Sequence, residues 1–295
     1  MERTFRIADY PFRVIGPDAV IPPENFLKFS AQPTSWAYTY EIALTEDLPS
    51  PRGALAAQRH DLLVYRENGL EQRYLSYYAD TAQRAFACYQ EEAPDHARVF
   101  LRPGILDDLV YDTVFTSLFS LERRMIDRSA LILHSSYIRY QDRAILFSAP
   151  SGTGKSTQAG LWERYRGVRQ INGDRSLLRQ IDGVWHACGW PVCGSSDICH
   201  NEDTPIRAIA MLSQSERNEI RRLRPMEAFS QLYSQITVNR WSRDFQTQAM
   251  DLIETLIREI PVYHLACTIS EDAVDCLDRA LQQEKEKNDG KRTDF

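Results

Sequence analysis

The first hundred residues are dominated by apolar side chains that alternate with small or polar ones. In Trp36–Leu44 the aromatic and aliphatic residues occupy every second position, which is typical of a strand with one buried face. Asn68-Gly69 lies between two further apolar runs and favours the tight turn of a β-hairpin. We therefore predict a β-rich, antiparallel N-terminal lobe over residues 1–104. Its expected strands are Trp36–Leu44, Leu62–Tyr65, Arg73–Tyr78, Arg84–Tyr89 and Ala97–Leu101.

The period of the pattern changes after residue 104. Apolar residues recur at steps of three and four, which predicts a helix over Asp107–Met125 with one buried face. Arg123 and Arg124 fall in its last turn, where they suit the helix dipole. Residues 105–127 are therefore expected to be a helix that links two domains. The apolar positions are Leu106, Leu109, Val110, Val114, Leu118, Leu121 and Met125.

From Ala130 onward, strand and helix patterns are mixed. Two hairpins flank a single strand–loop–helix unit, whereas a doubly wound domain alternates strand and helix throughout. This order predicts an α/β domain with a mixed sheet over residues 128–281. The charged stretch 282–295 is expected to be a disordered tail. The expected strands are Leu131–Ile138, Arg143–Ser148, Val168–Ile171, Ser176–Gln180, Val184–Ala187, Arg207–Leu212, Glu219–Leu223 and Val262–Ala266, and the expected helices are Gln158–Tyr165, Pro225–Val238, Phe245–Glu259 and Glu271–Leu281.

Composition and charge narrow the class of protein. The chain has 295 residues, of which 43% are hydrophobic and 26% charged, values of an ordinary soluble globular protein. A net charge of −6 argues against a general nucleic-acid binder. No apolar run approaches a membrane span, and the N-terminus lacks the basic and apolar regions of a secretory signal. We therefore expect a cytoplasmic protein with neither nucleic acid nor membrane as partner.

A glycine-rich loop carries the clearest chemistry in the chain. It follows the apolar run Ala144–Phe147 and precedes a stretch compatible with a helix, the setting that a phosphate-binding P-loop requires. Its glycines let the backbone approach phosphate oxygens, Lys155 can reach the β- and γ-phosphates, and the Ser156 hydroxyl can ligate Mg²⁺. The first glycine of the strict pattern is replaced by Ala149. The expected ATP-binding residues are Ser151, Gly152, Thr153, Gly154, Lys155, Ser156 and Thr157.

Two further residues are candidates for the same site. Asp174 directly follows the expected strand Val168–Ile171 and Asn172-Gly173, so it can serve as a Mg²⁺ ligand, as a general base, or as both. The alternative is an ordinary turn aspartate. His134 lies on the strand expected to pair with the one that leads into the loop. It is either a catalytic residue near the phosphates or a buried structural histidine.

Three other features leave alternatives open. The histidines and cysteines at 186, 188, 193, 199 and 200 could bind zinc, but they contain no C-x-x-C pair, and buried free thiols are favoured. The segment Gly189–Gly194 is either a turn or a substrate loop. Several arginines could clamp phosphates, and the sequence does not single one out; they are Arg207, Arg217, Arg221, Arg222, Arg224, Arg240 and Arg243.

The order of these motifs resembles the kinase domain of HPr kinase/phosphorylase, a family that shares a mixed-sheet P-loop fold with phosphoenolpyruvate carboxykinase. The resemblance covers about residues 128–281. It implies that Lys155 holds phosphates, that Ser156 and Asp174 bind the metal, and that His134 corresponds to the histidine upstream of the loop. The family carries adjacent aspartates where this chain has Gly173-Asp174-Arg175. Either one carboxylate does both jobs, or the enzyme is slower.

The resemblance implies an ATP- and Mg²⁺-dependent kinase that phosphorylates a serine of a peptide or protein. Family members also assemble into oligomers, so a homo-oligomer is a further expectation. Two alternatives remain: a nucleotide-binding regulator that transfers no phosphate, and a small-molecule phosphotransferase. The second would need a set of arginines for a carboxylate, or another metal site, and the sequence shows neither.

Overall fold

The computed structural model describes residues 1–32, 35–77 and 82–290. The chain divides into two compact units. Unit 1 contains Met1–Met125 and, from much later in the chain, Arg240–Arg243. Unit 2 contains Ile126–Asn239 and the residues from Asp244 onward. Among the described residues, no helix is long and apolar enough to cross a membrane.

Unit 1 is built on one eight-stranded sheet with the order β1-β2-β3-β8-β7-β6-β5-β4. The expected hairpin is confirmed: β5 and β6 pair antiparallel, and Asn68 and Gly69 both adopt positive φ between them. The expectation of a purely antiparallel lobe is wrong, because β3 pairs in parallel with both β2 and β8. Tyr78 lies outside the described residues. The strands are β1 (Glu2–Ile7), β2 (Tyr10–Ile15), β3 (Tyr38–Leu44), β4 (Ala54–Gln58), β5 (Leu62–Glu67), β6 (Leu70–Leu75), β7 (Ala87–Ala93) and β8 (His96–Leu101).

The expected helix 107–125 is replaced by three short helical segments. Tyr111 has an extended backbone and Ser120 a positive φ, so the helix is interrupted at both residues. Four of the seven apolar positions, Leu109, Leu118, Leu121 and Met125, are buried, but Val110 is exposed at 66%. Phe26 of α1 (Glu24–Leu27) packs on Phe5 of β1 at 4.9 Å and on Phe12 of β2 at 6.3 Å. The segments are η2 (Pro103–Val110), α2 (Asp112–Ser117) and α3 (Leu121–Ile126), and a single 3-10 turn, η1 (Ala82–Arg84), precedes β7.

A cluster of charged side chains is buried in unit 1, between β6, β7 and α3. Glu71, with a side chain that is 0% exposed, accepts hydrogen bonds from Arg73 at 2.7 Å and from Arg123 at 2.5 Å. The indole Nε1 of Trp241 donates to Glu71 at 3.2 Å, which fastens Arg240–Arg243 to this unit. The carboxylates of Glu71 and Glu122 hold the pKa of Arg73 well above its usual range, although burial opposes them. The Arg73 guanidinium therefore stays charged inside the unit.

Unit 2 contains a mixed sheet, as expected for an α/β chain. Its path is β10-β9-β12-β13-β14-β16-β15, with β11 paired to β9. β10 also pairs with β14, so five of these strands form a closed circuit. The pairs β10–β14 and β14–β16 are parallel and the others antiparallel. The strands are β9 (Leu131–Tyr140), β10 (Arg143–Ser148), β11 (Arg169–Asn172), β12 (Arg175–Ile181), β13 (Val184–Cys188), β14 (Thr204–Gln214), β15 (Glu219–Arg222) and β16 (Val262–Cys267).

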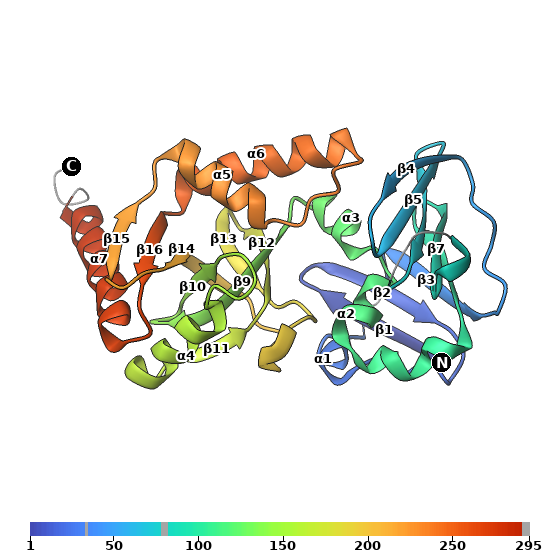
Figure 1. Ribbon diagram of the computed structural model, residues 1–295, viewed down its shortest axis with the longest axis horizontal. Helices are drawn as coiled ribbons and strands as arrows, with labels where there is room; N and C mark the ends of the chain where they lie inside the picture. The colour runs from blue at the N-terminus through green and yellow to red at the C-terminus, as the bar shows by residue number, and fades with distance from the viewer. Residues whose placement is uncertain (33–34, 78–81, 291–295) are drawn as a thin grey trace. The chain divides into compact units, whose positions relative to one another are not determined.

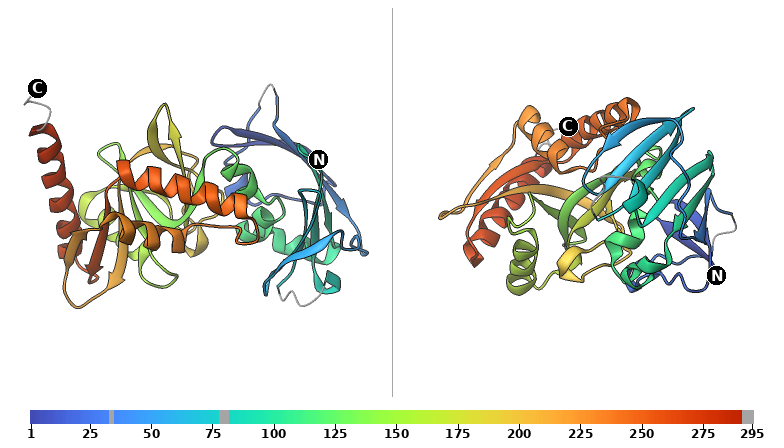
Figure 2. Two further views of the ribbon diagram at one scale, coloured as in Figure 1. Left: turned by 90° about the horizontal axis from the view of Figure 1, so that it is seen from above. Right: turned by 45° about the vertical axis from the view of Figure 1, so that its right-hand side comes forward.

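Helices cover both faces of this sheet (Figure 1). α5 (Pro225–Gln235) and α6 (Arg243–Glu259) bury Leu232 and Ile253 on one face, and the view from above shows α6 lying across the strands (Figure 2). α4 (Lys155–Arg166) and α7 (Glu271–Gly290) bury Trp162 and Leu277 on the other face. The sheet therefore lies between two apolar layers.

The predicted disorder of 282–295 is wrong for its first part, because α7 continues to Gly290. Leu281 is buried against the sheet, and Glu284 forms an ion pair with Arg222 at 2.7 Å. Both contacts stabilise the helix beyond the residue at which the sequence pattern ends. Residues 291–295 lie outside the described residues.

Candidate functional site

The glycine-rich loop joins the end of β10 to the start of α4. Gly152 and Gly154 adopt φ values of +78° and +114°, which disfavour residues with a side chain. Gly154 is the N-cap of α4, and no side chain caps this helix end. The backbone N–H groups of its first turn therefore remain suited to an anion. Gln214, the last residue of β14, donates a hydrogen bond to the Gly152 carbonyl at 3.4 Å.

Lys155 is buried at the start of α4. Its Nζ donates a hydrogen bond to the carbonyl of Ala149 at 3.3 Å, so the side chain folds back along the loop. Burial lowers the pKa of Lys155, while the nearby Asp174 carboxylate acts in the opposite direction. A cation in such a place gains most from a phosphate group, because an anion repays the cost of its burial.

β9 brings the loop and the acidic turn together. On one side it pairs with β10, so that Ser135 lies opposite Ser148 at the end of that strand. On the other side it pairs with β12, so that His134 lies opposite Arg175. The strand that carries His134 thus lies between the strand that leads into the loop and the strand that follows Asp174. The predicted pairing of the His134 strand with β10 is confirmed.

His134 and Asp174 are in direct contact. The distance from His134 Nε2 to Asp174 Oδ1 is 3.1 Å, and both side chains are about a fifth to a quarter exposed, at 21% and 24%. The second carboxylate oxygen lies 3.4 Å from Nε of Arg175. Burial raises the pKa of Asp174, but the His134 hydrogen bond and the positive charges of Arg175 and Lys155 outweigh it, so this pKa lies below its ordinary value. The carboxylate is therefore ionised at neutral pH.

The first turn of α4 contacts the acidic turn directly. The hydroxyl of Ser156 donates a hydrogen bond to the carbonyl of Gly173 at 3.3 Å, and Asp174 is the next residue. The oxygens of Ser156 and Asp174 are hard ligands of the kind that Mg²⁺ prefers. Residues 18 positions apart in the chain thus form one group of oxygen donors beside Lys155.

The turn requires glycine at position 173, because a side chain there would collide with neighbouring atoms. A Cβ at this position would lie 1.8 Å from the Ser196 hydroxyl and 3.1 Å from the Cys193 carbonyl. The segment Trp190–His200 lies across the turn, and Ile198 accepts a hydrogen bond from the Gly173 N–H at 3.2 Å. This segment overlaps Gly189–Gly194, for which a substrate loop is one of the two expectations. It borders Asp174, since a Cβ on Gly194 would lie 3.0 Å from the Asp174 Cβ.

Replacing Gly173 by alanine is expected to lower the free energy of unfolding by about 1–3 kcal/mol, the usual cost of overpacking. Adding Ser196→Gly should recover part of this loss, because it removes the atoms that the new methyl group would meet. Gly160→Ala, in α4 with nothing within 4 Å, is the matched control and should not destabilise the protein. Urea denaturation measures the free energy of unfolding of the parent and of these three variants. A Gly173→Ala protein as stable as the control would contradict the close approach.

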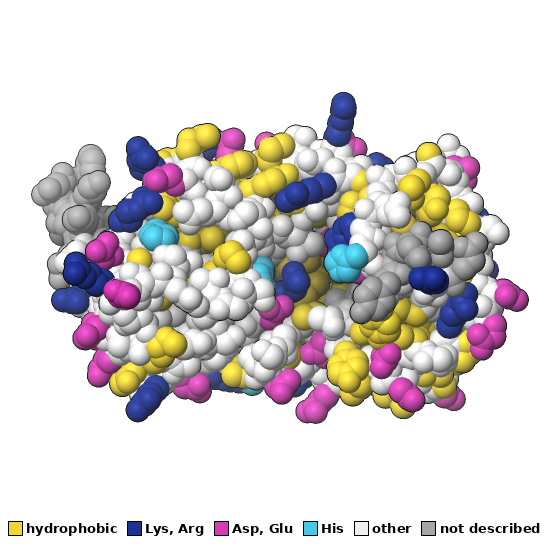
Figure 3. Space-filling model, viewed as in Figure 1, with side chains coloured by type: hydrophobic (Ala, Val, Ile, Leu, Met, Phe, Trp, Pro, Cys, Tyr) yellow, Lys and Arg dark blue, Asp and Glu magenta, His cyan; other side chains and the backbone are white. Residues whose placement is uncertain are grey.

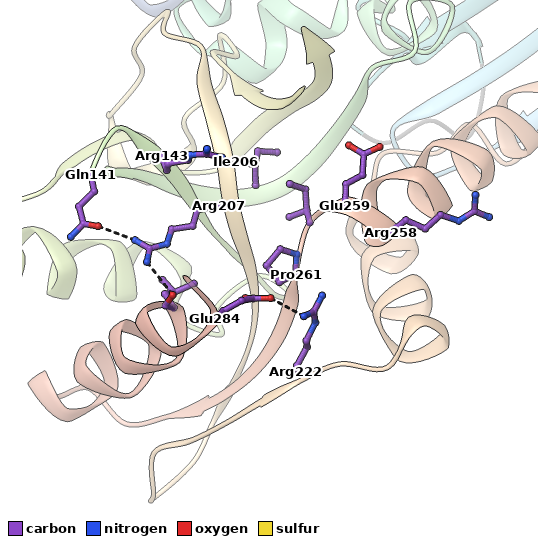
Figure 4. Close-up of a pocket in the computed structure, with 11 residues that line it drawn as sticks. Gln141, Arg143, Ile206, Arg207, Arg222, Arg258, Glu259, Pro261 and Glu284 are labelled. Atoms are coloured by element: carbon purple, nitrogen blue, oxygen red, sulfur yellow. Dashed lines mark hydrogen bonds and ion pairs between the residues drawn. The ribbon is translucent and has the colours of Figure 1, made fainter. Parts of the chain in front are cut away.

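Four of the arginines named from the sequence lie away from this site: Arg207, Arg221, Arg222 and Arg224. Arg207 and Arg222 line a hollow of about 680 Å³ between the N-terminal ends of β10, β14 and β16 (Figure 4). The glycine-rich loop follows the opposite, C-terminal end of β10. Arg221 and Arg224 pair with Glu227, while Arg240 and Arg243 belong to unit 1. The guanidinium at the site is that of Arg175, which the sequence reasoning missed; its position directly after Asp174 was the available signal.

The cysteine and histidine side chains between residues 186 and 200 do not form a metal-binding cluster. Within the described residues there is no cluster of three or more His, Cys, Asp or Glu side chains that could hold a metal ion. Cys188, Cys193 and Cys199 are buried, and His200 faces Arg169 at 3.1 Å. On the face of each unit shown in Figure 3, charged side chains of both signs are interspersed.

Comparisons with known proteins place this α/β chain in a family. The family model of the SynChlorMet cassette protein ScmC matches residues 105–282, more than half of the chain. The chain belongs to the ScmC family. None of the curated proteins is similar in sequence to it. Among solved structures, the HPr(Ser) kinase/phosphatase from Coxiella burnetii is similar with 12% identity and a TM-score of 0.35, over 55% of this chain and 96% of that one.

Proposed function

We propose that this protein is an ATP- and Mg²⁺-dependent kinase that transfers the γ-phosphate to a serine hydroxyl of a peptide or protein. The observation that carries the proposal is the contact between Ser156 and Gly173, at 3.3 Å. It brings the start of α4, with Lys155, beside the turn that bears Asp174. Phosphate binding, metal binding and proton acceptance are thus available within one group of side chains.

The residues at the start of α4 fit a nucleotide triphosphate. Its uncapped N–H groups and Lys155 offer hydrogen bonds and positive charge to phosphate oxygens. Ser156 and Asp174 would hold the Mg²⁺ ion, which when bound neutralises charge on the β- and γ-phosphates. The P-loop function of Ser151–Thr157 is thus supported by the conformation of its glycines and by the burial of its lysine.

In the proposed transfer, the serine oxygen of the acceptor forms a bond to the γ-phosphorus while the bond from that phosphorus to the β–γ bridging oxygen breaks. ADP leaves, and the serine proton passes to Asp174. The lowered pKa keeps Asp174 ionised and able to accept this proton. His134, hydrogen-bonded to Oδ1, orients the carboxylate.

A second candidate function is a nucleotide-binding regulator that transfers no phosphate. It is favoured by the state of Asp174, whose two carboxylate oxygens each face a basic side chain, His134 and Arg175. If these contacts persist when the nucleotide binds, neither oxygen is available to a metal or a proton. The products distinguish the two functions: a kinase yields ADP and a phosphoserine acceptor, whereas a regulator binds ATP with slow or no turnover.

The direct test uses γ-labelled ATP, Mg²⁺ and a library of serine-containing peptides, with the matching alanine peptides as controls. Label on serine peptides alone, together with an equal amount of ADP, is the expected result. ATP binding without labelled peptide, and without ADP formation, would favour the regulator. Release of inorganic phosphate alone would contradict both functions.

Lys155→Met is expected to lower ATP affinity at least about tenfold, because a buried cation that faces phosphates contributes more than 1.4 kcal/mol. The free protein should be at least as stable as the parent, since the substitution removes a cation whose pKa is lowered by burial. Isothermal titration and thermal unfolding measure the two effects. Arg164→Met, an exposed cation on the same helix, is the control. Unchanged ATP affinity in Lys155→Met would remove Lys155 from the binding site.

A further inference from the structure

Asn172 is the last residue of β11 and is completely buried, with 0% of its surface exposed. Its side-chain oxygen accepts hydrogen bonds from the backbone N–H groups of Asp174 and Arg175, each at 2.9 Å. Its side-chain nitrogen donates to the carbonyls of Trp190 at 2.9 Å and Val192 at 3.1 Å. A single amide therefore holds two separate segments of backbone.

No other side chain of this size can make the same four contacts. A neutral amide offers two acceptor sites on oxygen and two donors on nitrogen, and all four are used here. An aspartate would keep the acceptors but would place a negative oxygen against the carbonyls of Trp190 and Val192. A serine is too short to reach both segments. The position thus selects asparagine by its hydrogen bonds rather than by its volume.

The two segments that Asn172 joins meet at the candidate base. One is the turn Gly173–Arg175, and the other begins at Trp190 and continues to Gly194, which packs against Asp174. The Ser196 hydroxyl donates to the Cys193 carbonyl at 2.7 Å and closes this segment over Gly173. Gly194 is exposed, so the carboxylate borders solvent beside a residue that has no side chain.

We infer that Asn172 is a positioning residue, which fixes Asp174 for proton acceptance and fastens Trp190–Ser196 beside it as one wall of the acceptor site. The role of this wall rests on the proposed kinase function. A serine-bearing peptide would approach Asp174 past Gly194, where a larger residue would occupy the space next to the carboxylate. The role of Asn172 in holding the two segments together is inferred from its hydrogen bonds and does not depend on the kinase function.

The experiment compares Asn172→Asp and Asn172→Ser with Ser176→Ala. Ser176 is equally buried and lies in β12, the next strand in the chain. Its side chain forms a hydrogen bond with Ser135 at 2.8 Å. Hydrogen exchange, which needs no catalytic activity, is followed in peptides that cover 173–175 and 190–198. We expect exchange in 190–198 to rise at least tenfold in both Asn172 variants, which lose the amide donors. Exchange in 173–175 should rise at least tenfold in Asn172→Ser, whereas Asn172→Asp keeps the acceptor oxygen. Exchange in both segments should stay within twofold in Ser176→Ala.

The kinetic arm measures kcat, the acceptor KM and the ATP dissociation constant of the same proteins. We expect kcat to fall at least tenfold and the acceptor KM to rise, while ATP affinity changes less than twofold. Exchange in both Asn172 variants no greater than in the control would overturn the inference, whether or not the parent protein transfers phosphate. If the parent is active and the kcat and acceptor KM of the Asn172 variants match the control, the positioning role is overturned. If the parent protein binds ATP but labels no peptide, the proposed function is wrong. Hydrogen exchange then still tests whether Asn172 holds the two segments together.

Discussion

Asp174→Asn is expected to lower the rate of phosphoryl transfer about 10³-fold, within the range that a positioned general base contributes. The amide keeps the size of the carboxylate but cannot accept the serine proton. ATP should still bind, since Lys155 and the loop are unchanged. Single-turnover assays with γ-labelled ATP measure transfer, and titration measures binding. Asp182→Asn, an exposed turn residue at positive φ in the β12–β13 hairpin, is the matched control because asparagine tolerates that backbone well.

The pH dependence gives a second check on Asp174. Since folding lowers its pKa, its ion pairs stabilise the protein above the ordinary carboxyl value and lose that contribution as the pH falls through the lowered value. The parent should therefore gain stability over Asp174→Asn as the pH rises through this acidic range. Full transfer by Asp174→Asn would exclude Asp174 as the base.

Glu71→Gln is expected to lower the free energy of unfolding of unit 1 by about 3–5 kcal/mol, the usual cost of removing one partner from a buried ion pair. Glu71 is buried and receives Arg73, Arg123 and Trp241, so its neutralisation removes one of two counter-charges from each guanidinium group and leaves only Glu122 and Glu91. Urea dependence of hydrogen exchange in β6 and β7 measures the loss within this unit.

Glu67→Gln provides the control for Glu71→Gln. Glu67 ends the neighbouring strand β5 and is exposed, so its neutralisation should change stability by less than about 0.5 kcal/mol. If both variants lose equally little, the cluster around Glu71 does not stabilise unit 1. A loss confined to unit 2 would likewise contradict the assignment.

Much of the local structure was predictable from the chain. The hairpin at Asn68-Gly69 and the helices that begin at Pro225 and Glu271 depend on side chains close in sequence, which set the backbone angles directly. The apolar period over 107–125 correctly marked a buried face but missed its interruptions. Tyr111 and Ser120 break the helix through backbone conformations that no apolar pattern reports.

Strand neighbours were less predictable, because pairing depends on burial summed over the whole sheet. β3 alternates in the way an antiparallel strand does, yet it pairs in parallel with β2 and β8. The burial of the charged residues Glu71 and Arg73 was also not predictable, since charged residues of an alternating strand are normally expected on its exposed face. Their partners come from α3 and from Trp241, more than 45 residues away in the chain.

At the site, the glycine-rich loop with Lys155 and Ser156 was predictable from the chain, which also indicated His134 and Asp174 as separate candidates. A loop of this kind is a contiguous motif whose glycines, lysine and hydroxyl act through nearby backbone, so its chemistry can be seen without a fold. Three contacts are visible only in the folded chain: His134 with Asp174, Arg175 with the same carboxylate, and Asn172 with the backbone of the turn. These contacts depend on β9 lying between β10 and β12, and that order is fixed by the packing of two helical layers on the sheet rather than by any local pattern.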